Sequence, residues 1–409
     1  MINFKVTKKE REELVASGED LPATQATALK RLTSMFSTLE LFFVDRSTEL
    51  EQIKLALLTK EHVLLKGAPG TAKSLLARSV FQNIIGSSNY AVQFSKFMSE
   101  DYVFGPVNIR KLREDGEIVH NTKGTIVDSD FAFIDEFFDG SDVLLRSMLE
   151  VLNERTFTRN AKSLSCPLHT AILTSNFSRT EEETEAILDR ILFKSDVQPI
   201  SDADGRMSMY KSALDKNSTK KIAAIKMADL NVLTAFVKTG VSISEEVLTT
   251  YDRVVRDYMR QAKINTVTDR TCVKMLSILK ASAVLHGRSD VLPDDILSIK
   301  LSLCPSGDDL KEQAFESVYS RVVTEGKKEQ DELVEVKKMQ RKYEKICSTS
   351  QVNDKRKDSI LKIADLQKFL ETDLRNITGI TTQNVKDEVE KLGNKVDASI
   401  AAFKENINI

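Results

Sequence analysis

The stretch that decides the fold is Gly67-Ala68-Pro69-Gly70-Thr71-Ala72-Lys73-Ser74. An apolar run, His62–Lys66, precedes it, and a helical pattern, Leu75–Phe81, follows it, so the context is strand, glycine-containing loop and helix. The two glycines let the backbone curve tightly, so that successive N–H groups and the positive end of the helix face an anion. This context predicts a loop that binds nucleotide phosphates.

Two side chains in the loop have the chemistry that phosphate binding requires. Lys73 can reach the β- and γ-phosphates, and the Ser74 hydroxyl can coordinate Mg²⁺. The full pattern is G-x-x-x-x-G-K-[ST], and Ala72 stands where the pattern has its last glycine. We expect residue 72 to keep a negative φ, because only then is a methyl group tolerated there. The residues expected to contact the nucleotide are Gly67, Ala68, Pro69, Gly70, Thr71, Ala72, Lys73, Ser74 and Leu75.

Length and composition limit the class of protein. A chain of 409 residues exceeds a typical single core, so two or three domains are expected. An apolar content of 41% and a charged content of 29% are ordinary for a soluble globular protein. The formal net charge of -2 argues against a surface that coats nucleic acid.

Other compositional features exclude further classes. No segment has the roughly 18 consecutive apolar residues of a membrane span, and Met1–Glu10 lacks the apolar region of a signal peptide. We therefore expect a cytoplasmic protein. The four cysteines and four histidines are scattered without a CxxC pair, which argues against a zinc site or a disulfide framework.

The pattern of apolar residues divides the chain into four parts. Residues 1–60 contain a helical segment, with helices predicted at Ala26–Leu39 and Ser47–Leu58. Residues 61–200 alternate strands and helices, which predicts a largely parallel sheet covered on both faces. Residues 201–305 predict an all-α domain, and residues 306–409 predict a C-terminal helical, coiled-coil-like extension.

Individual elements are predicted within these parts. Strands are expected at His62–Leu65, Tyr90–Phe94, Phe131–Ile134 and His169–Leu173, with helices at Leu75–Ile85 and Val143–Leu152. Glycine and proline punctuation predicts one hairpin within Tyr102–Thr125 and a second at Thr156–Leu168. Four helices are expected at Leu230–Thr239, Ser244–Gln261, Asp269–Leu285 and Pro293–Lys300. In the extension, two or three amphipathic helices are expected to pack on one another.

A second motif lies roughly sixty residues after the loop. Phe131-Ala-Phe-Ile-Asp135-Glu136 is an apolar run that ends in two acids. The end of such a strand can direct Asp135 toward Mg²⁺ and place Glu136 to polarise an attacking water. An apolar run followed by two acids is often no more than a strand that meets solvent. Combined with the phosphate loop upstream, it predicts metal-assisted nucleotide hydrolysis.

Three more residues are candidates, each with a simpler alternative. Asn176 follows the next strand, where it could orient the water or contact the γ-phosphate, or be an ordinary turn asparagine. Arg190 could reach into the site of a neighbouring subunit, or form a surface ion pair. Arg270 could contact phosphate from the all-α domain, or be solvated beside a helix-capping Asp269.

This order of parts resembles the AAA+ ATPases. Within them, the chain is similar to the MoxR family, and nearest its RavA branch. The similarity lies in Gly67–Ser74 with alanine before the lysine, in Leu145–Arg155, in Ala186–Phe193, and in the pair Leu285–Arg288 and Leu292–Ile296. The resemblance covers about residues 30–305 and does not extend into the tail.

The resemblance implies a P-loop α/β domain with an all-α lid and a ring, usually a hexamer. It implies that ATP and Mg²⁺ are the cofactors, with Lys73 and Ser74 on phosphate and metal and Asp135 on the metal. Glu136 would position the water, Asn176 would be the first sensor, Arg190 the finger acting on the neighbour, and Arg270 the second sensor. MoxR relatives commonly act with a von Willebrand factor A partner, so a protein client is expected.

Three functions stay open at this point. The first is an ATP-driven, chaperone-like motor that remodels or activates a protein client. The second is a nucleic-acid motor or a restriction-type GTPase on the same core, with a pore lined by basic residues; these are Lys96, Arg110, Lys111, Arg113 and Lys123. The third is a nucleotide-gated scaffold whose tail binds a partner. Near-zero net charge favours the first over the second.

Overall fold

The computed structural model describes residues 21–159, 162–176, 187–214, 222–263, 267–304, 308–349, 354–374, 383–405 and 407. The chain divides into two units, residues 1–316 and residues 317–409, each with its own internal contacts. No helix among these described residues is long and apolar enough to cross a membrane.

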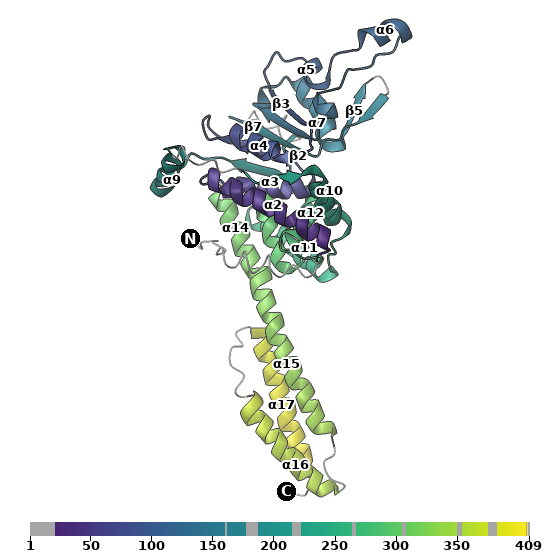
Figure 1. The fold of residues 1–409 in the computed structure, drawn as a ribbon. Coiled ribbons are helices and arrows are strands. Elements are labelled where there is room, and N and C mark those ends of the chain that lie inside the picture. The colour runs from purple at the N-terminus through teal and green to yellow at the C-terminus, as the bar shows by residue number, and fades with distance from the viewer. Residues whose placement is uncertain are drawn as a thin grey trace. The chain divides into compact units, whose positions relative to one another are not determined.

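A five-stranded parallel sheet forms the centre of the first unit (Figure 1). Its strands, in spatial order, are β3 (Asn89–Gln93), β4 (Phe131–Asp135), β7 (Thr170–Ser175), β1 (Val63–Lys66) and β8 (Phe193–Asp196). The register places Leu65 of β1 beside Thr174 of β7 and Ser195 of β8. The parallel sheet and its four predicted strands are confirmed, and β8 is a fifth strand that the apolar pattern did not reveal.

Helices cover both faces of this sheet, and β4 shows how the sequence directs them. Phe131 and Phe133 point to α4 (Lys73–Gln82), where Phe81 stacks on Phe131 with ring centroids 4.9 Å apart. Ala132 and Ile134 alternate to the other face. Burial on both faces explains why β4 is apolar at every position before its terminal acid.

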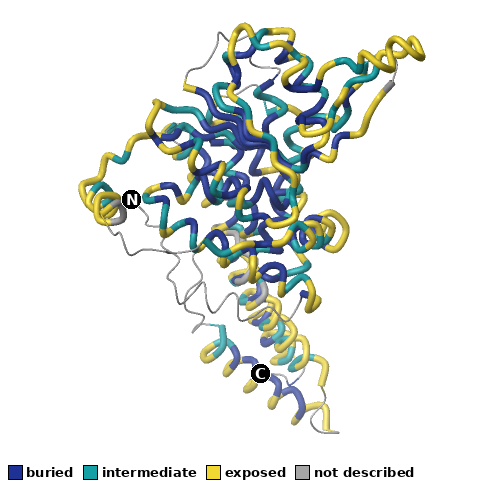
Figure 2. The backbone as a smooth tube through the Cα atoms, turned by 45° about the horizontal axis from the view of Figure 1, so that its top comes forward, coloured by how far each residue is buried: buried dark blue, intermediate teal, exposed yellow. Residues whose placement is uncertain are grey.

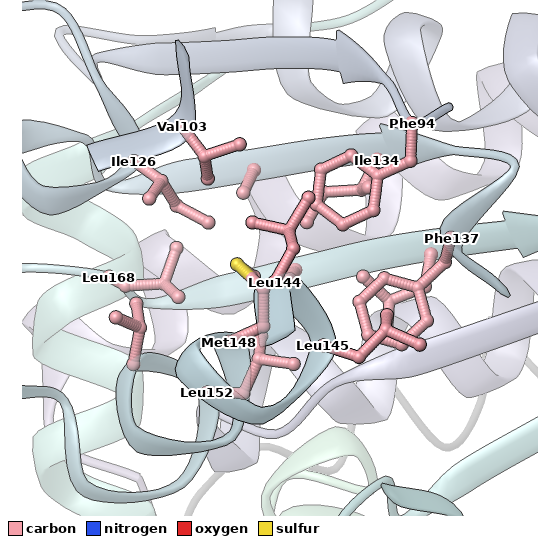
Figure 3. Close-up of a cluster of buried hydrophobic side chains, with 14 of the residues drawn as sticks. Phe94, Val103, Ile126, Ile134, Phe137, Leu144, Leu145, Met148, Leu152 and Leu168 are labelled. Atoms are coloured by element: carbon pink, nitrogen blue, oxygen red, sulfur yellow. The ribbon is translucent and has the colours of Figure 1, made fainter. Parts of the chain in front are cut away.

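The second face packs on α7 (Asp142–Glu154) in one apolar cluster (Figure 3). Leu144, Met148 and Leu152 lie one helical turn apart, so they share the face that meets Ile134. Figure 2 shows the strands of the sheet as the most buried part of the unit. This core holds the strand ends that carry the candidate residues.

Among the described residues, two helices precede β1, and both lie within the first unit. They are α2 (Ala23–Phe42) and α3 (Ser47–Thr59), as predicted from their apolar spacing. Helix α3 packs against β1 and β8, while α2 and α3 both pack against α10 (Met227–Thr239). The N-terminal helices therefore join the sheet to the helices that follow it in the chain.

One predicted hairpin is confirmed and the other is wrong. Strands β5 (Thr156–Arg159) and β6 (Lys162–Ser165) pair antiparallel, as expected. The segment 102–125 instead contains the end of α5 (Glu100–Phe104) and all of α6 (Ile109–Asp115), with an isolated bridge between Val107 and His120. Asn108 accepts a hydrogen bond from the N–H of Lys111, and this cap starts a helix where turn residues had indicated strands. Two 3₁₀ turns follow, η1 (Ile126–Asp128) and η2 (Phe137–Asp139).

The helices predicted after residue 201 are present. They are α10, α11 (Glu245–Gln261), α12 (Asp269–Leu285) and a 3₁₀ segment, η3 (Pro293–Ile299), that continues as α13 (Lys300–Leu303). In the chain, helix α9 (Ala203–Leu214) precedes these helices and helix α14 (Asp309–Tyr319) follows them. The expectation that strands stop at residue 201 is wrong, because β9 (Ile225–Lys226) pairs with β2 (Ile84–Ile85). A pair of two-residue strands is too short to leave a periodic pattern.

The described residues of the second unit include three long helices. They are α15 (Glu325–Ser348), α16 (Lys355–Lys368) and α17 (Gln383–Glu405), with π-helical turns η4 (Ser320–Thr324) and η5 (Phe369–Leu374). Leu366 and Phe369 pack with Val396 and Ile400, and Met339 and its neighbours on α15 pack against that cluster. The prediction that the apolar stripes pack on one another is confirmed.

Candidate functional site

The loop between β1 and α4 lies against the ends of the two neighbouring strands. The N–H of Gly67 donates to the carbonyl of Ser175 over 3.1 Å. Gly67 has φ of +146°, and a Cβ there would lie 2.3 Å from the carbonyl oxygen of Val197. Only glycine fits this position, because both the backbone conformation and the close approach exclude a side chain.

Ala72 adopts a left-handed conformation, with φ of 66° and ψ of 17°, at the start of α4. The expectation of a negative φ is therefore wrong. The chain must turn sharply here so that the N–H of Leu76 can donate to the carbonyl of Ala72, over 2.9 Å. A left-handed alanine costs about 1–2 kcal/mol, so the loop keeps its glycine-like geometry against the preference of its residue.

The Lys73 ammonium is held inside the loop. Its Nζ donates to the carbonyls of Gly67 and Ala68, over 2.6 and 2.9 Å, and to Oδ1 of Asn176 over 3.1 Å. Burial lowers the pKa of Lys73; Glu136 and Asp135 act in the opposite direction, and Arg46 adds to the lowering. The Lys73 ammonium thus lies at the inner side of the loop, beside the carbonyls of Gly67 and Ala68.

Asp135, at the end of β4, receives two hydroxyl hydrogen bonds. The Ser74 Oγ donates to Oδ2 over 3.1 Å, and the Thr174 Oγ1 donates to Oδ1. A carboxylate beside a hydroxyl is an oxygen donor set of the kind that Mg²⁺ prefers, since Mg²⁺ is usually bound by one or two protein oxygens together with substrate phosphates. No cluster of three or more acidic, histidine or cysteine side chains that could hold a metal occurs in the described part of the chain. Ser74 and Asp135 therefore fit a magnesium ion.

Glu136 and Asn176 are brought together by the parallel strand order. The N–H of Asn176 donates to Oε2 of Glu136 over 3.2 Å, and its side-chain amide donates to Oε1. Glu136 has φ of 51°, a left-handed conformation at the start of η2. Asn176 thus contacts both Lys73 and Glu136. The alternative that Asn176 is an ordinary turn asparagine does not account for its contacts with Lys73 and Glu136.

Arg46 is a loop contact that sequence reasoning missed. Its guanidinium donates to the carbonyl of Gln198 over 2.9 Å and to that of Thr71 over 3.4 Å, and the residue is buried. Arg46 therefore joins the loop to the residues that follow β8. A single arginine before a helix gives no periodic signal, so only the fold reveals this role.

The contacts described for the other two candidate arginines, Arg190 and Arg270, join residues 189 and 190 to α12. The carbonyl of Arg190 accepts from Nζ of Lys274 over 3.2 Å. Arg270 lies 3.8 Å from Oδ2 of Asp189 and is half-exposed. Asp269 is not the cap of its helix, because the Thr268 hydroxyl accepts from the N–H of Thr271 instead.

Known families match this architecture over most of the first unit. The family described as the MoxR domain in the MoxR-vWA-beta-propeller ternary systems matches residues 30–235, which is half of the chain. The AAA lid domain matches residues 248–309. The two matches cover the sheet with its loop and the helices α11 to α13.

Similar proteins agree with these matches. The uncharacterized protein MJ0079 of Methanocaldococcus jannaschii is 27% identical over 269 residues, 66% of this chain and 68% of that protein. The Chaperone MoxR1 of Mycobacterium tuberculosis is 24% identical over 273 residues, 63% and 70% of the two chains. The crystal structure of a candidate ATPase from Cytophaga hutchinsonii superposes with a TM-score of 0.58 at 17% identity, covering 73% of this chain and 96% of that one. At that identity the likeness supports the fold alone.

Fold, loop geometry and family matches agree on one class. The parallel sheet presents Lys73, Asp135 and Asn176 at the carboxyl ends of neighbouring strands, where ligands bind in open α/β sheets. The chain belongs to the MoxR family of AAA+ ATPases.

Proposed function

We propose that this chain binds ATP with Mg²⁺ and hydrolyses it in a ring of its own copies, usually six in such families, to remodel or activate a protein client. One observation carries the proposal. Five side chains meet at the carboxyl ends of β1, β4 and β7; they are Lys73, Ser74, Asp135, Glu136 and Asn176. These are the charge, hydroxyl, carboxylate and amide groups that phosphoryl transfer to water requires.

Each residue has a separate task in this proposal. Lys73 and the loop N–H groups from Gly70 to Leu75 hold the phosphates, and Ser74 with Asp135 holds the magnesium ion. When bound, that ion offsets the negative charge that builds up on the phosphates. Glu136 accepts a proton from the attacking water, and Asn176 orients it as the first sensor. The Lys73 ammonium has three N–H donors, and those that now bind the carbonyls of Gly67 and Ala68 can bind a phosphate oxygen instead.

Two arginines complete the proposed site. Arg190 supplies a positive charge to the site of the neighbouring subunit, so that hydrolysis depends on assembly. Arg270, at the start of α12, contacts phosphate as the second sensor when the lid closes. We place the chain nearest the RavA branch because it carries a helical unit, residues 317–409, beyond the lid.

A protein client is supported by the family description and by one relative's name. The matched family is described from MoxR-vWA-beta-propeller systems, and one relative is named a chaperone. We propose that a von Willebrand factor A domain protein is the partner of this chain too. The net charge of -2 fits a protein partner better than a nucleic acid.

Hydrolysis by the full-length chain tests the proposal. We expect Glu136→Gln to lower turnover by at least about 100-fold, because the amide cannot accept the proton of the water, while the nucleotide-bound ring persists in analytical ultracentrifugation. Glu154→Gln, an exposed change on α7, is the control and keeps full turnover. Wild-type turnover by Glu136→Gln, or a wild type that stays monomeric with ATP and hydrolyses it, would reject the proposed role.

A further inference from the structure

Asp189, the residue before Arg190, is bound by the start of the lid helix α12. Its Oδ1 accepts from the Thr268 hydroxyl over 2.7 Å and lies 3.5 Å from the Thr271 hydroxyl. Its Oδ2 lies 3.8 Å from Nη1 of Arg270. Three side chains from the first turn of α12 thus contact the Asp189 carboxylate, and one of them is Arg270, the proposed second sensor.

A second contact follows one turn further along α12. Lys274 Nζ donates to the carbonyl of Arg190 over 3.2 Å and forms an ion pair with Glu61 at 2.7 Å. Thr268, Thr271 and Lys274 are spaced by three residues, so they share one face of the helix. The lid therefore holds both the side chain before Arg190 and the backbone of Arg190 itself.

A third contact comes from another lid element. The Ser302 hydroxyl of α13 donates to the carbonyl of Leu192 over 2.8 Å, in a buried position. Residues 189 to 192 are therefore held by lid side chains at both ends. We call residues 189–192 with these lid contacts the finger segment.

Capping of α12 does not explain the Asp189 contact. Thr268 already caps that helix through the N–H of Thr271, and this bond does not involve Asp189. The apolar face of α12, with Met275, Ile278 and Leu279, is buried independently. The contacts to the finger segment therefore do something besides start and hold the helix.

We propose that Asp189 is a positioning residue that couples the lid of a subunit to the Arg190 that this subunit gives to its neighbour. The inference rests on the proposed function, in which Arg190 acts across a subunit boundary. Arg270 reports the nucleotide of its own subunit to α12, and α12 moves the finger segment with it. The state of one site thereby sets the charge offered to the next site in the ring.

Mixed assemblies of full-length subunits test this coupling. Asp189→Ala subunits alone are expected to lose about tenfold or more in turnover, since the carboxylate that joins the finger segment to α12 is removed. Glu136→Gln subunits cannot hydrolyse ATP but keep Arg190 and its lid contacts. In an equimolar mixture, the Asp189→Ala sites that face intact neighbours are expected to recover, so turnover per Asp189→Ala subunit rises several-fold. Asp252→Asn, an exposed carboxylate on α11, is the control that keeps full turnover.

Arg190→Ala mixed with Glu136→Gln separates the inference from the proposal beneath it. Recovery in that mixture without recovery for Asp189→Ala would overturn the coupling alone. No recovery in either mixture would show that Arg190 does not act on a neighbour, and both ideas would fall. Wild-type turnover by Asp189→Ala alone would also overturn the coupling.

A milder pair of variants guards against misfolding. Thr268→Val keeps the shape of the side chain but removes the donor to Asp189 together with the cap of α12. We expect the same loss as for Asp189→Ala and the same recovery in the mixture, because an intact neighbour supplies a correctly held Arg190 but does not restore a lost cap. Thr268→Ser keeps the hydroxyl and is expected to retain turnover. Equal behaviour of the valine and serine variants would count against the inference.

Discussion

The hydroxyl of Ser74 donates a hydrogen bond of 3.1 Å to Oδ2 of Asp135, a residue 61 positions further along the chain. The bond joins the phosphate loop after β1 to the end of β4, with β7 between these strands. The strand order alone therefore brings the Ser74 hydroxyl and the Asp135 carboxylate, two oxygen groups that can bind a metal, next to each other. The proposed metal site is preorganised, because its donors need no large movement to meet an ion.

Removal of either donor should weaken magnesium binding. We expect Ser74→Ala to raise the Mg²⁺ concentration needed for half-maximal ATP binding by about tenfold, and Asp135→Asn by about 100-fold, since the carboxylate contributes the charge. A titration of Mg²⁺ with a fluorescent ATP analogue measures both. Ser79→Ala on the same helix is the matched control. Equal midpoints for all four proteins would contradict the assignment.

Loss of Arg190 should separate binding from turnover. We expect Arg190→Ala to lower turnover by about 1,000-fold, as for a finger that stabilises charge in the transition state, while the Kd for ATP changes by less than about threefold. Steady-state hydrolysis and equilibrium binding measure the two quantities. Arg256→Ala, an exposed change on α11, serves as the control. A parallel loss of binding would place Arg190 in its own subunit's site instead.

The left-handed Ala72 makes a prediction about stability. Ala72→Gly relieves the strain but adds freedom to the unfolded chain, so the free energy of unfolding should stay equal or rise by up to about 1 kcal/mol. Ala72→Val should lower it by more than about 1 kcal/mol, because a β-branched residue disfavours this conformation. Urea unfolding measures both. Equal destabilisation by glycine and valine would mean that backbone strain is not what limits this position.

Two buried histidines predict a loss of stability in acid. Burial lowers the pKa of His169 to about 3, with Lys60 and Arg155 adding to the effect, and burial also holds the pKa of His62 well below its usual range. Since the unfolded chain binds protons below about pH 6.5 and the folded chain does not, stability falls as the pH drops below that value. Each histidine contributes up to about 1.4 kcal/mol per pH unit.

The measurable quantity is the slope of unfolding free energy between pH 5 and 6.5. We expect His169→Asn to reduce this slope by up to about 1.4 kcal/mol per pH unit, whatever its effect on absolute stability. His286→Gln is the control, since that side chain is half-exposed. An unchanged slope in His169→Asn would show that the ring is protonated in the folded protein.

Local sequence was enough to place most of the candidate residues at the ends of their strands. Lys73, Ser74, Asp135 and Glu136 stand next to apolar runs whose burial on both faces of the sheet makes them recognisable. Asn176 could be placed for the same reason, because it follows β7. The sequence therefore predicted which residues end which strands.

Features that depend on distant contacts were not accessible in this way. The positive φ of Ala72 follows from how the loop fits between strands, and a residue's own preference opposes it. Arg46 reaches the loop by a contact that no spacing encodes. The hairpin predicted within Tyr102–Thr125 is replaced by α6, because a capped two-turn helix and a strand bounded by turn residues have similar short patterns.

The place of β1 in the sheet has a consequence for how the protein is made. Its partners, β7 and β8, lie at residues 170–175 and 193–196, so β1 leaves the ribosome long before either neighbour exists. Val63, Leu64 and Leu65 are fully buried in the finished fold and lack that shelter in the nascent chain. Because such distant pairings form slowly and leave apolar segments open to aggregation, helix α3, which packs against β1 and is synthesised just before it, is the segment in position to cover it during translation.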